Sequence, residues 1–224
     1  MYCVNILKRS IEEDISSYLK NNDYKTLFIW GPRRSGKTTL INNLAKKLGV
    51  AKYNFDLASD YEKFVPRRDA LEKLVAENKA ILVDEVQNYP EVTVVLKLLH
   101  DEFKVKVIAT GSSELRQKAG EKFDTMASRY NEIYCLPFSL SEIYQNKKPK
   151  ASDETRFCKQ MATNSQIWGT YPEIYTKYSL SENRKISLLQ RILDAYVLKD
   201  VVNIYELKNQ KLAKDILIKI ALQL

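Results

Sequence analysis

The residues with the clearest chemical potential lie between positions 31 and 39, where the sequence reads Gly-Pro-Arg-Arg-Ser-Gly-Lys-Thr-Thr. Gly31 and Gly36 allow a close backbone approach that a β-carbon would block, so successive N–H groups can turn toward a polyphosphate. Lys37 can reach the β- and γ-phosphates, and the Thr38 hydroxyl can ligate Mg²⁺. The spacing therefore predicts a phosphate-binding loop for ATP and Mg²⁺. The residues expected to bind the nucleotide are Gly31, Pro32, Arg33, Arg34, Ser35, Gly36, Lys37, Thr38 and Thr39.

Two adjacent acids form the second candidate site. Asp84 and Glu85 directly follow the apolar run 80–83. A buried parallel strand that ends in acids delivers carboxylates to the C-terminal edge of a sheet, where open α/β folds bind ligands. Asp84 can hold the water shell of Mg²⁺ opposite Thr38. Glu85 can orient and deprotonate an attacking water. We predict Thr38 and Asp84 as metal ligands and Glu85 as the general base.

Hydroxyl groups mark the end of a neighbouring apolar run. Ser112 and Ser113 follow residues 104–110 and Gly111. Their hydroxyls can sense the γ-phosphate by hydrogen bonding to it or to the lytic water, so Ser112 is a catalytic candidate. A plain turn, or the N-cap of a helix beginning near Glu114, explains both serines as well.

Strand and helix patterns supply the elements that must position these residues. The phosphate-binding loop follows the apolar run 26–30 and precedes a helical pattern that starts at residue 40. Other strands are predicted at 50–55, 80–83, 104–110 and 132–136, and helices at 8–22, 66–78 and 90–103. Arg9, in the first helical segment, either touches the ligand or is simply solvated. Ser139 and Glu142 predict a capped helix start.

A composition shift at 146–153 divides the chain. We predict an α/β ATPase domain over 1–145 and a helical domain over 151–224. Helical patterns there cover 153–167, 181–206 and 211–224.

Whole-chain properties limit the partners. The 224 residues carry 36 Lys and Arg against 28 Asp and Glu, a net charge of +8. This surplus leaves two alternatives open, a nucleic-acid partner or solubility together with a pocket that receives ATP. Charges interrupt every apolar run before the 18 or so residues needed to span a bilayer, so we expect no membrane span and a cytoplasmic protein. The 3 cysteines are widely spaced, which argues against a disulfide framework and a zinc site.

Several segments together resemble the prokaryotic AAA+ superfamily predicted ATPases, in which an AAA ATPase domain precedes a helical C-terminal domain of unknown function. The resemblance runs from about Arg9 to about Asp200. Besides the loop, it depends on Leu-Val-Asp-Glu-Val-Gln at 82–87, Thr-Gly-Ser-Ser at 110–113, Arg129-Tyr130, Leu-Pro-Phe-Ser at 136–139 and Gly-Thr-Tyr-Pro-Glu at 169–173.

The resemblance implies a three-layer P-loop NTPase fold with a five-stranded, mainly parallel sheet in the order 5-1-4-3-2. It assigns Lys37 and Thr38 to the Walker A motif, Asp84 and Glu85 to Walker B, and the Gly-Ser-Ser strand end to sensor 1. Members usually have Gly-Arg before the fifth strand, whereas this chain has Ser128-Arg129. Arg129 is therefore either a sensor or arginine finger at the phosphate, or part of a structural ion pair.

These observations favour a Mg²⁺-dependent ATPase that acts with an unidentified protein partner or a second copy of the chain. One alternative is a nucleotide-gated module that binds protein or DNA with negligible turnover. A small-molecule kinase is the other, although the sequence offers no recognisable acceptor site or lid.

Overall fold

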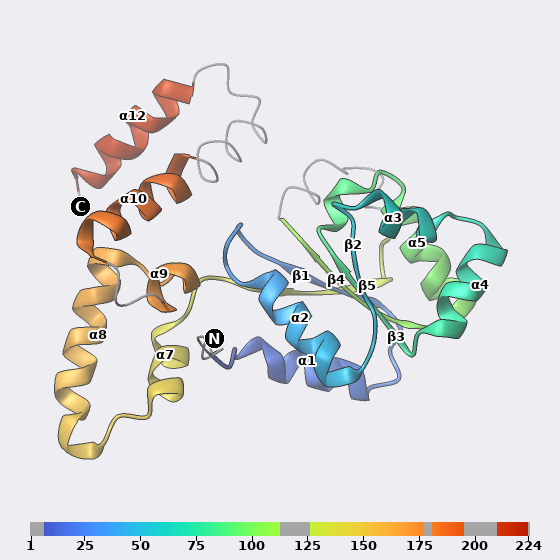
Figure 1. Cartoon of the computed structure of the whole chain (residues 1–224), viewed down its shortest axis with the longest axis horizontal. Coiled ribbons are helices and arrows are strands. Elements are labelled where there is room, and N and C mark those ends of the chain that lie inside the picture. The colour runs from blue at the N-terminus through green and yellow to red at the C-terminus, as the bar shows by residue number, and fades with distance from the viewer. Residues whose placement is uncertain (1–6, 113–125, 177–180, 195–209, 224) are drawn as a thin grey trace. The chain divides into compact units, whose positions relative to one another are not determined.

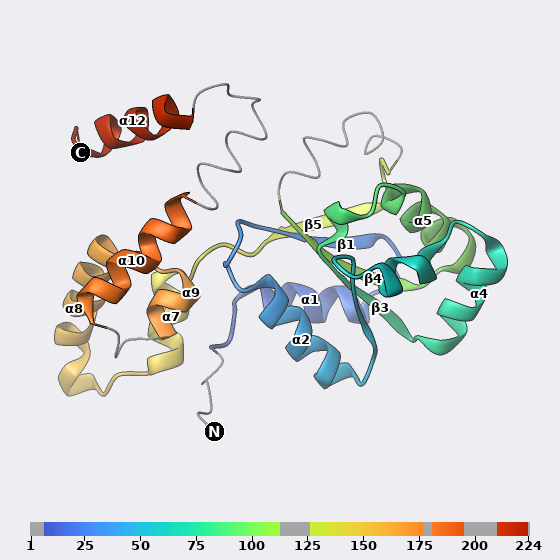
Figure 2. The ribbon, with the colours of Figure 1, turned by 45° about the horizontal axis from the view of Figure 1, so that its top comes forward.

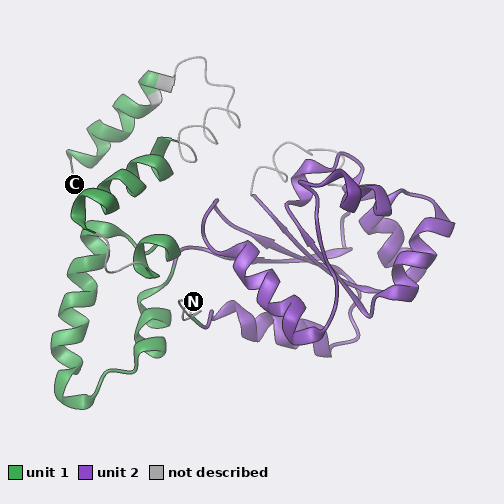
Figure 3. Ribbon diagram, in the orientation of Figure 1, with its two compact units in different colours: residues 1–7, 138–224 green, residues 8–137 purple. Residues whose placement is uncertain are grey.

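The computed structural model describes residues 7–112, 126–176, 181–194 and 210–223 (Figure 1). The chain forms two compact units, one of residues 8–137 and the other of residues 1–7 and 138–224 (Figure 3). We call them the sheet unit and the helical unit. Among the described residues, no helix combines the length and the apolar character that crossing a membrane requires.

The sheet unit is built on five strands, β1 (Thr26–Trp30), β2 (Lys52–Asn54), β3 (Ala80–Asp84), β4 (Lys106–Gly111) and β5 (Tyr130–Tyr134). Their order is β2-β3-β4-β1-β5, and every pairing is parallel. The predicted α/β fold and strand order are therefore confirmed. The last strand starts two residues earlier than expected, because Tyr130 pairs with Thr26 and packs edge-to-face on Phe28.

Both faces of the sheet are covered, which is why its central strands are apolar at consecutive positions. Leu27 and Ile29 face a layer made by α1 (Ile11–Lys20) and α2 (Lys37–Leu48). Phe28 and Trp30 stack with ring centroids 4.7 Å apart on the opposite face. That face packs against α4 (Arg68–Glu77) and α5 (Val92–Leu98). Figures 1 and 2 show the resulting three layers. Short helical segments complete the unit: α3 (Ala58–Tyr61), η1 (Glu62–Phe64), η2 (Val86–Asn88) and η3 (Leu99–Phe103).

The end of α1 is fixed to the N-terminal edge of the sheet. The Tyr18 hydroxyl lies 2.8 Å from the Lys25 carbonyl oxygen and accepts a hydrogen bond from the Val107 N–H at 3.2 Å. Burial raises the pKa of the Tyr18 phenol. The Lys106 ammonium donates to the Tyr18 carbonyl at 2.8 Å and to Asn21 Oδ1 at 2.6 Å. These bonds hold the helix against the start of β4.

The helical unit contains α7 (Leu140–Lys147), η4 (Ala151–Asp153), α8 (Glu154–Trp168), α9 (Pro172–Thr176), α10 (Glu182–Ile192) and α12 (Gln210–Ala221). The predicted cap of α7 is confirmed. Ser139 Oγ accepts from the Glu142 N–H at 3.1 Å, and the Glu142 carboxylate accepts from the Ser139 N–H at 2.9 Å. Because Ile143 of α7 packs with Phe138 and Tyr175, α7 belongs to the helical unit. The predicted boundary between 145 and 151 stays a prediction. Residues 195–206 of the helix predicted over 181–206 lie outside the described residues.

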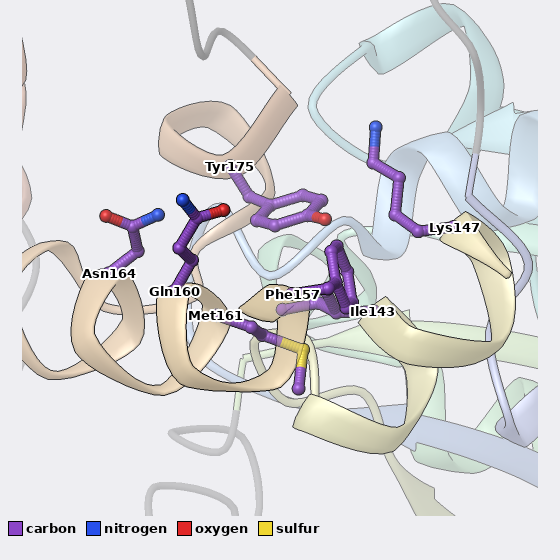
Figure 4. Close-up of a pocket in the computed structure, with 7 residues that line it drawn as sticks. All are labelled: Ile143, Lys147, Phe157, Gln160, Met161, Asn164 and Tyr175. Atoms are coloured by element: carbon purple, nitrogen blue, oxygen red, sulfur yellow. The ribbon is translucent and has the colours of Figure 1, made fainter. Parts of the chain in front are cut away.

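A pocket of about 290 Å³ opens between α7, α8 and α9. In Figure 4 the Tyr175 ring, Phe157 and Ile143 gather at its centre, and Lys147 and two amide side chains surround them. The lining residues are Ile143, Lys147, Phe157, Gln160, Met161, Asn164 and Tyr175.

Candidate functional site

The loop between β1 and α2 has left-handed backbone at two residues and no room for a side chain at a third. Arg34 and Gly36 have φ values of 62° and 101°, in the left-handed region where a glycine meets no steric penalty. Gly31 is constrained by space instead. A β-carbon there would lie 2.1 Å from the carbonyl oxygen of Cys135, just after β5. The loop therefore packs directly against the end of β5.

Lys37 is the first residue of α2, and its side chain folds back over the loop. Its ammonium donates hydrogen bonds to the carbonyl oxygens of Gly31 at 2.8 Å and Pro32 at 2.9 Å. Burial lowers the pKa of Lys37, while the negative charges of Glu85 and Asp84 oppose that shift. The ammonium therefore lies in the field of the predicted general base, Glu85, and of the predicted metal ligand, Asp84.

The remaining loop residues differ in exposure. Ser35 is fully buried, and its hydroxyl has no hydrogen-bond partner within the described part of the chain. Thr38 and Thr39 are exposed in the first turn of α2. Of the others, Pro32 and Arg34 are half-buried and Arg33 is exposed. The first turn of α2 thus presents hydroxyl groups where the positive end of the helix dipole lies.

The Arg9 side chain is buried and forms hydrogen bonds to the loop and to the chain after β5. Its side chain is 7% exposed, and Nη1 donates to the Ser35 carbonyl oxygen at 2.9 Å. The same nitrogen lies 3.6 Å from Cys135 Sγ, and Nη2 donates to the Leu136 carbonyl oxygen. Arg9 is buried, so the expectation that it is simply solvated was wrong, and contact with a ligand stays a prediction. It joins the phosphate-binding loop to the end of β5.

Asp84 ends β3 at the same sheet edge and is 1% exposed. Its Oδ1 accepts a hydrogen bond from the Thr110 hydroxyl, and its Oδ2 pairs with the Lys52 ammonium at 3.2 Å. Each carboxylate oxygen retains a lone pair after one such bond, so Asp84 can still accept from another donor. The sequence reasoning missed Thr110. The available signal was its position at the end of the apolar run 104–110, two residues before Ser112.

Glu85 lies next to the loop with a backbone φ of 56°, which is uncommon for a residue with a side chain. Its carboxylate accepts a hydrogen bond from the Gln87 amide. The other end of that amide, Oε1, accepts from the backbone N–H of Ser112 at 3.3 Å. Ser112 is 4% exposed, and its hydroxyl has no partner among the described residues. Ser113 and Glu114 lie outside them.

Arg129 is placed elsewhere. Its carbonyl oxygen accepts a hydrogen bond from the N–H of Thr26, the first residue of β1. The phosphate-binding loop begins after Trp30, at the other end of this five-residue strand, so the Arg129 backbone lies about 13 Å from the loop. Its Nε donates to Asp101 Oδ1 at 2.8 Å and Oδ2 at 3.1 Å. This bond holds the pKa of Asp101 at about 2. The structure therefore does not bring Arg129 to the loop of its own chain, and the structural ion pair is the arrangement observed. A role at the site of a neighbouring copy stays a prediction.

Comparison with family models gives one match, to a family described as an AAA domain, over residues 23–144. The match covers more than half of the 224 residues and includes every predicted site residue. The chain belongs to the AAA domain family. Membership supports a nucleotide-binding, ATPase-like function.

Solved structures show distant similarity to this AAA domain. The S. cerevisiae Hsp104-ADP complex is 18% identical with a TM-score of 0.47, and the match covers 74% of this chain and 29% of that one. Bacteroides sp Pif1 in complex with ADP-AlF4 is 13% identical with a TM-score of 0.40, covering 66% and 48%. A complex of two Pif1 helicases on forked dsDNA is 16% identical with a TM-score of 0.43, covering 60% and 44%. The chain thus spans less than half the length of each. A search of curated proteins finds no match.

In this AAA domain, the predicted residues converge at one place. Lys37 and the loop follow β1, Asp84 ends β3 and Glu85 follows it. Ser112 follows β4, which lies between those two strands. Because all strands are parallel, their carboxyl ends meet at one edge of the sheet. Arg129 is the exception.

Proposed function

We propose that this AAA domain binds ATP and hydrolyses it with the help of Mg²⁺. The observation that supports the proposal best is the meeting of a loop closed by the Lys37 ammonium with two adjacent carboxylates at one sheet edge. A cation for the phosphates and a base for water are the two groups that phosphoryl transfer to water requires.

In the proposed complex, the backbone N–H groups of the loop, from residue 33 onward, bind the phosphates. The Lys37 ammonium leaves the Gly31 and Pro32 carbonyls to reach the β- and γ-phosphates. Three buried hydroxyls have no hydrogen-bond partner among the described residues, and two of them, Ser35 Oγ and Ser112 Oγ, lie at this edge of the sheet and support this assignment. An unsatisfied buried hydroxyl is unfavourable, so a phosphate oxygen that accepts from it would stabilise the complex.

The residues at the sheet edge fit a Mg²⁺ ion that arrives with the nucleotide. Within the described residues, no group of three or more His, Cys, Asp or Glu side chains could hold a metal ion. Mg²⁺ in nucleotide sites is commonly bound by one or two protein oxygens together with substrate phosphates. The exposed Thr38 hydroxyl would be a direct ligand, and Asp84 would accept from water on the ion. When bound, the ion would neutralise charge on the phosphates.

Glu85 is the proposed base for the attacking water. As the water oxygen bonds to the γ-phosphorus, its proton passes to the Glu85 carboxylate. The bond from that phosphorus to the β–γ bridging oxygen breaks, and ADP leaves with the electron pair of this bond. Lys37, the loop N–H groups and Ser112 stabilise the negative charge on the transferred group.

The variant Glu85→Gln tests the proposal. We expect it to bind Mg-ATP as wild type does, seen as an equal rise in melting temperature, and to release phosphate at least about 100-fold more slowly. Glu77→Gln, an exposed residue at the end of α4, is the matched control and should keep the wild-type rate. Equal rates in Glu85→Gln and wild type would refute the assigned base. A melting temperature that Mg-ATP leaves unchanged in wild type would refute nucleotide binding.

One observation favours the nucleotide-gated binding module as a second candidate. Leu212, Ile216 and Ile220 recur every fourth residue on α12 and are 57%, 49% and 50% exposed. An exposed apolar helix face of this kind is typical of a surface that binds another protein. Tight ATP binding by wild type, with single-turnover hydrolysis no faster than the uncatalysed reaction, would support the module over the ATPase.

A further inference from the structure

Gln87 connects the predicted general base to a second strand. It lies in η2, the short helical turn that directly follows Glu85, and its side chain is half-buried. One end of its amide contacts the Glu85 carboxylate, and the other end contacts the backbone of Ser112 after β4. A single side chain therefore spans the ends of β3 and β4.

The chemistry of its two partners fixes the orientation of this amide. The Ser112 backbone N–H can only donate, so the atom facing it must be the carbonyl oxygen of Gln87. The NH₂ group must then face Glu85, whose ionised carboxylate can only accept. Glutamate at position 87 would lack the NH₂ group that donates to Glu85, and asparagine would be one methylene too short to reach both partners.

The structure leaves space for this bridge at Gly111. A β-carbon on Gly111 would lie 3.1 Å from Gln87 Oε1, 3.1 Å from a Val86 methyl and 2.9 Å from the Trp30 ring. Any larger residue would have to displace one of these groups. The glycine at the end of β4 therefore lets the Gln87 amide approach the Ser112 N–H.

We propose that Gln87 is a positioning residue that holds the Glu85 carboxylate in place for hydrolysis. The inference rests on the proposed ATPase function. Glu85 projects from a backbone with φ of 56°, and its carboxylate accepts a hydrogen bond from the Gln87 amide. The same strand end also holds the other acid, since Thr110 donates to Asp84. The end of β4 thus fixes both acids, one directly and one through Gln87.

The variant Gln87→Met tests the proposal, because methionine keeps the length of the side chain and removes both hydrogen bonds. We expect kcat for ATP hydrolysis to fall roughly 10- to 100-fold, as a misplaced catalytic group does. The Kd for Mg-ATP should stay within about twofold, because Gln87 does not belong to the phosphate-binding loop. Asn88→Ala is the matched control. Asn88 is the next residue in the same turn, and its amide donates to Asp56 instead.

A double variant separates positioning from a general structural effect. If Gln87 acts only through Glu85, Gln87→Met combined with Glu85→Gln should be no slower than Glu85→Gln alone. Gln87→Glu should also lower kcat, because two carboxylates would then face each other. Additive losses in the double variant would overturn the proposal. Wild-type kcat in Gln87→Met would overturn it too and leave the ATPase standing, whereas no hydrolysis by wild type would refute both.

Discussion

The two edges of the sheet differ in the partners of their buried and half-buried polar groups. At the N-terminal edge, Arg129 forms an ion pair with Asp101 through two contacts, and the Lys106 ammonium binds neutral oxygens, those of the Tyr18 carbonyl and the Asn21 side chain. At the C-terminal edge, the Lys37 ammonium binds only neutral carbonyls, although two carboxylates lie in its field. Among the described residues, the buried hydroxyls of Ser35 and Ser112 have no hydrogen-bond partner at this edge, whereas the N-terminal edge has one such hydroxyl, that of Thr26.

The difference indicates which buried polar groups of this fold can form new hydrogen bonds with a ligand. Paired groups stabilise the folded chain and gain nothing from a ligand, whereas buried polar groups without full pairing gain hydrogen bonds when a ligand arrives. Substitutions at the C-terminal edge should therefore change function most, and those at the N-terminal edge should change stability alone.

The largest effect is expected at Lys37. Lys37→Met should weaken Mg-ATP binding about 100-fold, because charge-assisted hydrogen bonds to phosphate are lost. The free energy of unfolding should change by no more than about 1 kcal/mol, since burying the ammonium is itself unfavourable. Titration calorimetry and urea unfolding would measure the two quantities. Lys46→Met, at an exposed position of the same helix, is the control. A large loss of stability in Lys37→Met, with unchanged affinity for Mg-ATP, would show that Lys37 stabilises the fold and does not bind the ligand.

Arg9 should show a mixed effect, because it supports the site without belonging to it. Arg9→Met leaves the carbonyls of Ser35 and Leu136 without their donor. We expect the free energy of unfolding to fall by about 2 kcal/mol and the Kd for Mg-ATP to rise about tenfold. Arg9→Lys keeps the charge but cannot reach both carbonyls, so its free energy of unfolding and its Kd should lie between those of wild type and Arg9→Met. Wild-type stability in Arg9→Met would show that the loop does not need this support.

Lys106 provides the matching test at the N-terminal edge. Lys106→Met removes the bonds that hold the end of α1 to β4, so we expect a loss of about 1 kcal/mol in the free energy of unfolding. ATP affinity and turnover should not change. Thermal unfolding followed by circular dichroism, together with a phosphate-release assay, would show this, with the exposed Lys104→Met as control. A drop in turnover would mean that the two edges are coupled.

The smallest effect is expected at Arg129, and it should depend on pH. Arg129 lowers the pKa of Asp101 to about 2, so the pair contributes stability above the unfolded pKa near 3.8 and loses it as pH falls toward 2. Because both side chains are about one-third exposed, we expect Arg129→Gln to lower the free energy of unfolding by less than about 1 kcal/mol at pH 7. The difference from wild type should shrink in urea titrations below pH 4. A constant difference from pH 7 to pH 3 would contradict the ion-pair explanation.

Much of the sheet unit could be predicted from local sequence. The runs 26–30 and 80–83 are apolar at consecutive positions because both sheet faces are covered, and they became β1 and β3. The spacing of Gly31, Gly36 and Lys37 predicted a loop between β1 and α2, and the structure has one there. The strand order came from the family resemblance, because no local pattern specifies which strands are neighbours.

The contacts that were missed join residues far apart in sequence. Arg9 binds the carbonyls of Ser35 and Leu136, which are 26 and 127 positions away. Gln87 meets Ser112 only because β3 and β4 are adjacent. Polarity and spacing cannot predict such pairs, since each depends on the register of two strands. For the same reason the sequence left Arg129 open between the phosphate and a structural ion pair, because it does not show that the start of β5 lies beside the start of β1.

The packing of Gly31 against Cys135 has a consequence for saturation mutagenesis of this motif. Every substitution at position 31 inserts an atom 2.1 Å from a main-chain oxygen, so it should be eliminated by selection for folding alone. Thr38 is exposed, and its replacement disturbs no packed neighbour. If substitutions at codon 31 are not tolerated, the cause would be the packing of the fold. If substitutions at codon 38 are not tolerated, the cause would be the loss of ligand binding.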